Sequence, residues 1–160
     1  MAPLGASSDR GRIEPASRAG QRVLVSNHAG TLHCLTVSVS SEPTLDEAYE
    51  RCLVDATADL VGHLQDILRP RSGGSRIVVI VRWKAGENPH LCEAAVGAVR
   101  GLVLSVADEV APSDDTVPPA VLNVIVGGSI ADGELQATLD YLASPEAGHV
   151  SAATLRLEIP

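Results

Sequence analysis

Apolar and polar residues alternate in blocks along most of this chain, and each block has the length of one strand or one helix. Continuous apolar runs at residues 76–81 and 121–126 are typical of strands that are buried on both faces of a sheet. Residues 22–26, 32–39 and 153–159 form further stretches rich in β-branched and aliphatic side chains. The pattern therefore predicts a sheet of four to five strands.

Helical spacing of apolar residues fills the intervals between these strands. Residues 44–68 carry an apolar side chain every three or four positions, and Thr44 with Glu47 matches a capping box at the start. Two further helices are predicted at residues 88–110 and roughly 131–143, the former rich in small side chains. Strands that alternate with helices indicate a three-layer α/β fold, in which a mostly parallel sheet has right-handed crossovers and helices on both faces.

The composition describes the core and sets the domain boundary. The chain of 160 residues has no Phe, one Trp and two Tyr, so Val, Leu, Ile and Ala must fill the interior. Residues 1–20 are rich in Gly, Ala, Ser, Pro and Arg without any period, which predicts a flexible tail. We therefore expect one α/β domain over residues 21–160.

Charge and cysteine usage argue against several classes of partner. A formal net charge of −8 disfavours nucleic acid and anionic membrane surfaces, because both attract basic proteins. No apolar run approaches the length of a membrane span, and no signal peptide is evident. The three cysteines form no CxxC pair, so we expect reduced thiols in a cytoplasmic protein. The five histidines lack the spacing of metal ligands, which predicts no metal site.

Four segments match, in their order along the chain, motifs of one enzyme family. They are VLVSNHAG at residues 23–30, GLVLSVADE at 101–109, LNVIVGG at 122–128 and YLASPEAGHVSAATL at 141–155. Together they resemble the short-chain dehydrogenase/reductases from the fourth strand of their fold onward. The resemblance implies a partial Rossmann-like sheet, with residues 22–26 as the counterpart of that fourth strand.

The departures from this family bear directly on function. The first three strands and the Thr-Gly-x-x-x-Gly-x-Gly loop, which holds the cofactor pyrophosphate, have no counterpart in the sequence. We therefore expect no NAD(P)H site and no other cofactor. Motif spacing places the catalytic Asn, Ser, Tyr and Lys of the family at Ala56, Arg82, Cys92 and Val96. The resemblance thus implies the fold without the reduction chemistry, because Cys92 and Val96 cannot replace a tyrosine acidified by a lysine.

A few residues remain candidates for other chemistry. His28, Arg82 and Cys92 would share the remnant cleft, where a cysteine next to a positive charge could act as a nucleophile. Asn27, Gly127 and Gly128 are weaker candidates for holding a ligand or cofactor. Each of these residues also has an ordinary structural interpretation, as a buried hydrophobe or a turn residue.

The retained elements are those through which the family assembles. The resemblance implies a homodimer or higher oligomer through helices 44–68 and 88–110, and an active short-chain dehydrogenase/reductase paralogue is a further candidate partner. Without the first three strands, the apolar edge at residues 22–26 needs a cover. Either residues 32–39 fold back onto this edge or a partner chain covers it.

These observations support three hypotheses of function. The first is a non-catalytic, reductase-like protein that acts as an oligomeric structural or regulatory subunit. The second is a repurposed enzyme of the isomerase, cyclase or lyase type, for example in a biosynthetic pathway, that uses the remnant cleft. The third is a small-ligand-binding domain. A fold alone does not decide among them.

Overall fold

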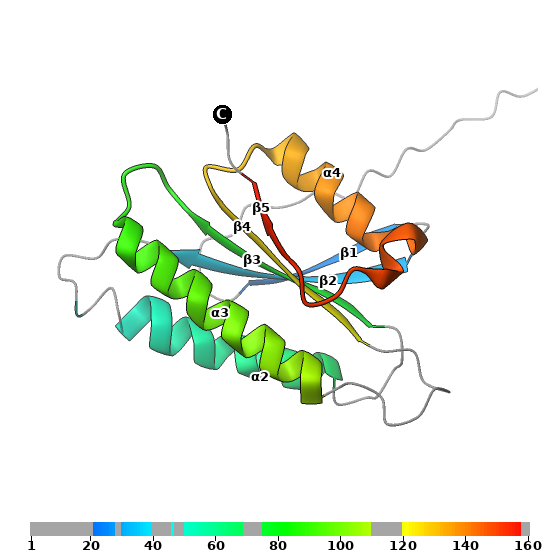
Figure 1. The fold of residues 1–160 in the computed structure, drawn as a ribbon, viewed down its shortest axis with the longest axis horizontal. Helices are drawn as coiled ribbons and strands as arrows, with labels where there is room; N and C mark the ends of the chain where they lie inside the picture. Colours follow the sequence, from blue (N-terminus) through cyan, green and yellow to red (C-terminus); the bar gives the residue numbers. More distant parts are fainter. Residues whose placement is uncertain are drawn as a thin grey trace, which may run out of the picture.

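The computed structural model describes residues 21–27, 30–39, 46, 50–68, 75–109 and 120–157, and the tail predicted at residues 1–20 lies outside them (Figure 1). The elements in chain order are β1 (Gln21–Asn27), β2 (Gly30–Val39), the π-helical turn η1 (Glu50–Asp55), α2 (Ala56–Leu68), β3 (Arg76–Trp83), α3 (Pro89–Glu109), β4 (Val121–Gly128), α4 (Asp132–Ala143), the 3-10 turn η2 (Pro145–His149) and β5 (Thr154–Arg156).

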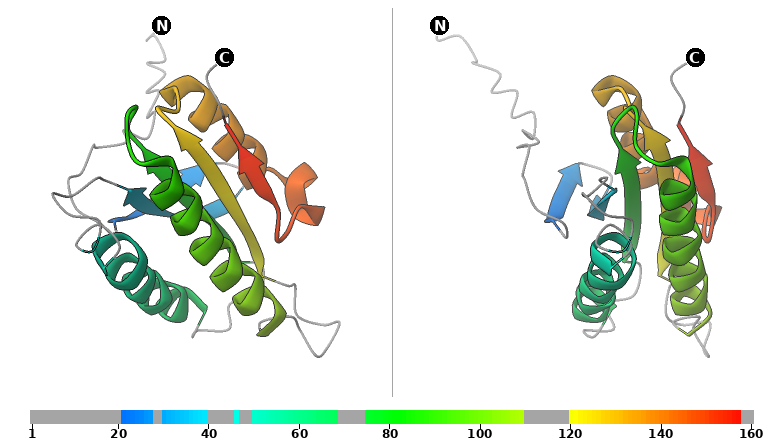
Figure 2. Two further views of the ribbon diagram at one scale, coloured as in Figure 1. Left: turned by 60° about the vertical axis from the view of Figure 1, so that its left-hand side comes forward. Right: turned by 90° about the vertical axis from the view of Figure 1, so that its left-hand side faces the viewer.

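The strands form one five-stranded sheet in the order β1-β2-β3-β4-β5. Strands β2 to β5 are parallel, and β1 pairs antiparallel with β2. Helices α2 and α3 lie side by side on one face of the sheet, and α4 covers the other face (Figures 1 and 2). The predicted fold class, a three-layer α/β domain with a mostly parallel sheet, is confirmed.

The two central strands are hydrophobic throughout because each contributes to two cores. On β3, Val79 and Val81 pack toward α2 and α3, whereas Val78 and Ile80 pack toward α4. All four side chains are almost fully buried. A strand between two helical layers needs an apolar side chain at every position, which explains the continuous apolar runs in the sequence.

The order of the first two strands corrects one expectation. The resemblance makes residues 22–26 the counterpart of the family's fourth strand, with residues 32–39 or a partner chain as a cover. In the structure β2 lies between β1 and β3 instead, with Leu32 paired to Arg76 and Val39 to Trp83. Strand β1 is the edge strand instead, in a hairpin with β2. Residues 32–39 do fold back onto 22–26, as one of the two alternatives proposed. Buried Leu35, Val37 and Val39, which pack in the larger core, give β2 the inner position.

The crossovers do not all have the predicted right hand. Each of the three connections from β2 to β5 moves to the next strand in the same direction across the sheet. Because α4 lies on the face opposite α2 and α3, the last crossover has the opposite hand to the first two. Two polar side chains hold this unusual connection in place. Arg76 donates to the carbonyls of Leu142 and Ser144, and Asn123 donates to the carbonyl of Val150.

Two predicted elements are described only in part. Within the helix predicted over residues 44–68, Asp46 is helical, residues 50–55 form the π-helical turn η1 and residues 56–68 form α2. The capping pair Thr44 and Glu47 lies outside the described residues. The last strand was predicted over 153–159, and its described part pairs with β4 only at Thr154–Arg156.

Candidate functional site

The connections of β3 and β4 leave the sheet on opposite faces. After β3 the chain enters α3 on one face, and after β4 it enters α4 on the other (Figure 2). In open α/β sheets such a divergence between neighbouring parallel strands marks the crevice in which ligands bind, at the carboxyl ends of the strands. We therefore examined the ends of β3 and β4, which we call the switch edge: residues 82–84 and 127–129 with Ser38 of β2.

An indole closes one side of the switch edge. Trp83, at the end of β3, packs against the core formed with α2 and α3, and its ring lies against Gly128. The backbone amide of Ser129 donates to the Trp83 carbonyl at 3.0 Å. Gly128 therefore lets the Trp83 indole pack closely against β4. The Ser129 amide that follows already donates a backbone hydrogen bond within the chain. A β-carbon at Gly127 would collide with the Leu157 carbonyl oxygen and with Ile130.

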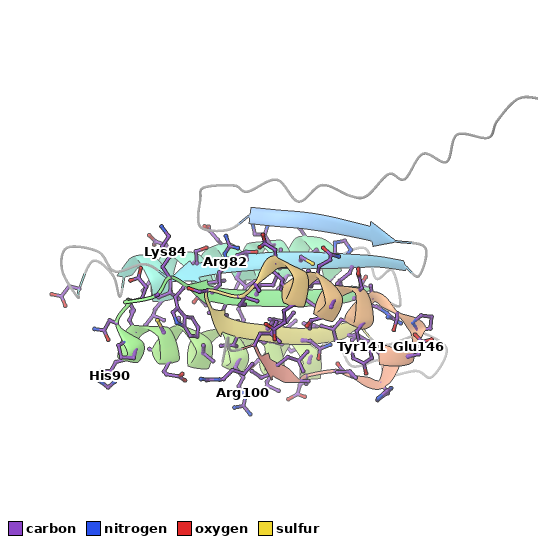
Figure 3. The ribbon with its side chains drawn as sticks, turned by 90° about the horizontal axis from the view of Figure 1, so that it is seen from above. Arg82, Lys84, His90, Arg100, Tyr141 and Glu146 are labelled. Carbon is purple, nitrogen blue, oxygen red and sulfur yellow. The ribbon has the colours of Figure 1, made fainter. Side chains whose placement is uncertain are left out.

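The α4 side of the switch edge carries polar and cationic side chains. Ser38 and Arg82 are register partners on β2 and β3, so their side chains share this face. Both are exposed, as is Lys84 just beyond the end of β3. Arg82 and Lys84 lie at the same end of the molecule, near the start of α4, whereas His90 lies at that end below α3 (Figure 3).

Three of the four positions that the family resemblance assigns to catalysis lie in the hydrophobic core. The relative exposures of Ala56, Cys92 and Val96 are 3%, 2% and 7%. Cys92 and Val96 stand one turn apart on the sheet-facing side of α3. Only Arg82, the fourth position, is exposed. Arg82 and Cys92 therefore lie in different environments, because Arg82 is exposed to solvent and Cys92 is packed among aliphatic side chains.

The remaining predicted residues lie elsewhere or outside the described chain. Asn27 pairs with Gly30 at the start of β2. This is the amino end of the parallel strands, whereas Arg82 lies at their carboxyl end. His28 lies outside the described residues. Asn27 and Arg82 are therefore not brought together into one cleft.

The first turn of α3 is fixed by two polar interactions. The side chain of Asn88 accepts a hydrogen bond from the backbone amide of His90 at 3.0 Å, which caps the helix. One turn further, Glu93 forms an ion pair with Arg156 of β5 at 3.0 Å. Both partners are about half exposed, so the pair orients the end of β5 more than it stabilises the fold.

Cysteines and other metal-binding side chains form no cluster in the part of the chain that the structure describes. Within it, no three His, Cys, Asp or Glu side chains are placed to hold a metal ion. Burial raises the pKa of the Cys34 thiol from 9.0 to about 12, so this side chain stays protonated at neutral pH. A protonated, buried thiol is a poor nucleophile.

Helix α3 is long and apolar. Among the described residues, it is the one helix long and apolar enough to cross a membrane, judged by length and composition. The core helix of a soluble protein meets the same criterion.

Sequence reasoning identified Arg82 but missed its neighbours at the switch edge. Ser38 sits between two buried valines, and this polar side chain near the end of an alternating strand was the available signal. Lys84 follows Arg82 by two residues and is the only lysine of the chain. Asn123, buried in β4, was visible as the one polar residue in an apolar run.

Comparison with models of protein families gave no match, and comparison with curated proteins gave no significant relative.

Proposed function

We propose that this protein is a non-catalytic, reductase-like subunit that assembles with a second copy of itself through the outer surface of α3, supported by α2. The observation that carries the first half is the burial of Ala56, Cys92 and Val96. Aliphatic packing at these positions leaves no group there to transfer a proton to a substrate. The chain order of helices and strands from α2 to β5 also fits the resemblance, although β1, its counterpart of the fourth strand, is an antiparallel edge strand.

The outer surface of α3 supports the second half of the proposal. The helix is apolar, yet only 33% of its most apolar window is buried. Gly97, Gly101 and Ser105 follow one another at four-residue spacing on its exposed side. No atom lies within 4 Å of a β-carbon built at either glycine. Such a surface allows another helix to approach closely.

Charge complementarity favours a second copy as the occupant. Arg100, Leu104 and Asp108 are exposed and lie at four-residue spacing on α3. In an antiparallel pair of α3 helices centred on Leu104, each Arg100 faces Asp108 of the other copy. A twofold interface makes every such contact twice, so one sequence pattern supplies two ion pairs. On α2, exposed Ala58 and Gly62 extend the surface of small residues.

Oligomeric mass tests the assembly directly. We expect light scattering of the full chain at micromolar concentration to give a dimer, and Gly101→Arg to give a monomer. A β-carbon at Gly101 has open space around it, so we expect the free chain to accommodate this arginine. Gly133→Arg is the matched control, because Gly133 on α4 is equally open and lies outside the surface. A monomeric wild type, or a Gly101→Arg dimer, would overturn the assembly.

A charge exchange tests the antiparallel geometry. Arg100→Asp and Asp108→Arg each place like charges opposite one another, and we expect both single variants to weaken the dimer. The double variant restores opposite charges, and so does an equimolar mixture of the two single variants. If neither the double variant nor the mixture recovers the dimer mass, α3 does not pair in this way.

The non-catalytic assignment has its own test. We expect the purified chain to oxidise no NADPH in the presence of carbonyl compounds, because the buried side chains at Ala56, Cys92 and Val96 offer no group that transfers a proton. Carbonyl-dependent NADPH oxidation that Arg82→Gln abolishes would refute the assignment. This result is independent of the oligomeric mass.

A further inference from the structure

We propose that Ser38, Arg82 and Lys84 bind the phosphate group of a small ligand at the switch edge. This inference goes beyond the proposed assembly and does not depend on it. Binding alone is proposed, with no bond made or broken in the ligand.

The geometry of the sheet brings the three groups to one place. Ser38 and Arg82 are opposite one another in the register of β2 and β3. Their neighbours Val37, Val39 and Val81 all point into the core with α2 and α3. Ser38 and Arg82 therefore rise from the α4 side of the sheet, and Lys84 follows two residues later near Arg82 (Figure 3).

The electrostatics of the chain make these two cations unusual. With a net charge of −8, acidic side chains outnumber basic ones, yet two cations stand together at the end of β3. Two other arginines of the described chain are engaged, since Arg76 binds carbonyls at the end of α4 and Arg156 pairs with Glu93, whereas Arg100 is exposed on α3. Within the described residues, neither Arg82 nor Lys84 forms an ion pair.

The position in the fold defines the direction from which a ligand approaches. Trp83 closes the α2 and α3 side of the switch edge, which leaves the α4 side. Helix α4 begins on that side, and its N-cap Ala131 provides no side-chain cap. The first turn of α4 carries Asp132 and Glu134, whose negative charges offset the positive end of the helix dipole. The charge that holds the anion must come from Arg82 and Lys84.

The three side chains suit a phosphate group in particular. A guanidinium presents two parallel N–H donors to two phosphate oxygens, an ammonium adds a second positive charge, and a hydroxyl donates to a third oxygen. A carboxylate carries only one negative charge, so two cations attract it less strongly than they attract a phosphate group.

Trp83 supplies the experimental readout because it lies between the two cations in sequence and is the only tryptophan. We expect pyrophosphate, and more weakly inorganic phosphate, to change its fluorescence saturably, with half-saturation at about 1 mM or below at constant ionic strength. Amine acetylation gives a second readout, because Lys84 is the only lysine. We expect pyrophosphate to slow acetylation of Lys84 while acetate at equal ionic strength does not.

Variants locate the site. Arg82→Gln and Lys84→Gln are each expected to weaken pyrophosphate binding about tenfold or more, since each removes a charge-assisted hydrogen bond. Arg100→Gln is the matched control: it removes the same charge from an exposed position on α3, and we expect it to leave pyrophosphate binding unchanged whatever its effect on dimer mass. Unfolding curves verify that the exposed substitutions leave the fold intact.

Three results would overturn the site. The first is no saturable fluorescence change and no protection of Lys84 up to about 10 mM pyrophosphate. The second is equal weakening by Arg100→Gln, which would indicate a nonspecific charge effect. The third is equal protection by acetate, which would indicate a site for carboxylates. All of them leave the dimer proposal standing, so the two proposals fail separately.

Discussion

The indole of Trp83 lies so close to Gly128 that a β-carbon at position 128 would stand 2.6 Å from the indole nitrogen. This contact joins the ends of β3 and β4 at the point where their helices diverge to opposite faces. It therefore determines which side of the switch edge is open.

Replacement of Gly128 by alanine tests this contact. We expect Gly128→Ala to displace the indole and to lower the free energy of unfolding by about 1–3 kcal/mol, the usual cost of overpacking. Because Trp83 is the only tryptophan, its emission is expected to shift to longer wavelength. Gly133→Ala, at an open helical position, is the control and is expected to leave the emission unchanged. An unshifted spectrum in Gly128→Ala would contradict the contact.

Asn123 is expected to be a major determinant of stability. Its side chain donates to the Val150 carbonyl at 2.8 Å and accepts from the Ala153 amide at 3.0 Å. We expect Asn123→Leu to cost about 2 kcal/mol or more, because both backbone groups lose their partner in a buried place. Chemical denaturation measures this loss. Asn123→Asp keeps the acceptor, and its stability is expected to rise at low pH, where the protonated acid can again donate.

Arg76 makes the corresponding connection at the end of α4. Its guanidinium donates to the Leu142 carbonyl at 3.1 Å and to the Ser144 carbonyl. We expect Arg76→Met, which keeps the apolar stem, to lower the free energy of unfolding by about 1–3 kcal/mol. Arg76→Lys is the control and is expected to recover part of that loss. Equal stability of Arg76→Met and wild type in urea would show that these hydrogen bonds contribute nothing.

The buried thiol of Cys34 predicts a pH dependence at alkaline pH. The pKa of this thiol is about 12 in the folded chain and 9.0 in ordinary surroundings, so the unfolded chain releases the proton first. The stabilisation is complete below pH 9 and is lost as the pH rises toward 12, by about 1.4 kcal/mol per pH unit. Cys34→Ala removes this dependence, and the difference between the two unfolding profiles isolates it. Parallel profiles above pH 9 would contradict the burial of the thiol.

The sequence predicted the elements whose patterns are local. The apolar runs of β3 and β4 and the long apolar helix α3 were recognisable because burial on two faces or on one face gives a distinct periodicity. The order of β1 and β2 was not recognisable in the same way. The polar residues of β2, such as His33 and Ser38, are compatible with an edge strand. They are equally compatible with an inner strand whose carboxyl end is exposed, so the sequence does not decide between the two positions.

Features that depend on distant residues were beyond the local pattern. Arg76 and Asn123 bind the last crossover through partners that lie 66 and 27 residues away along the chain. At the candidate site, Arg82 was predicted from motif spacing, but Ser38 joins it only through strand register. Register follows from the packing of whole strands, and one residue of slip would move Ser38 to the other face.

The hydrogen bonds from Arg76 and Asn123 also define a unit of the fold. Both anchoring residues belong to the central strands, whereas all their partners lie between Leu142 and Ala153. The segment from α4 to β5 thus docks onto a sheet that must already exist, and β5 contributes only three residues to it. Such a segment can detach and return while β2, β3 and β4 stay folded, so its backbone amides would exchange with deuterium before those of the central strands.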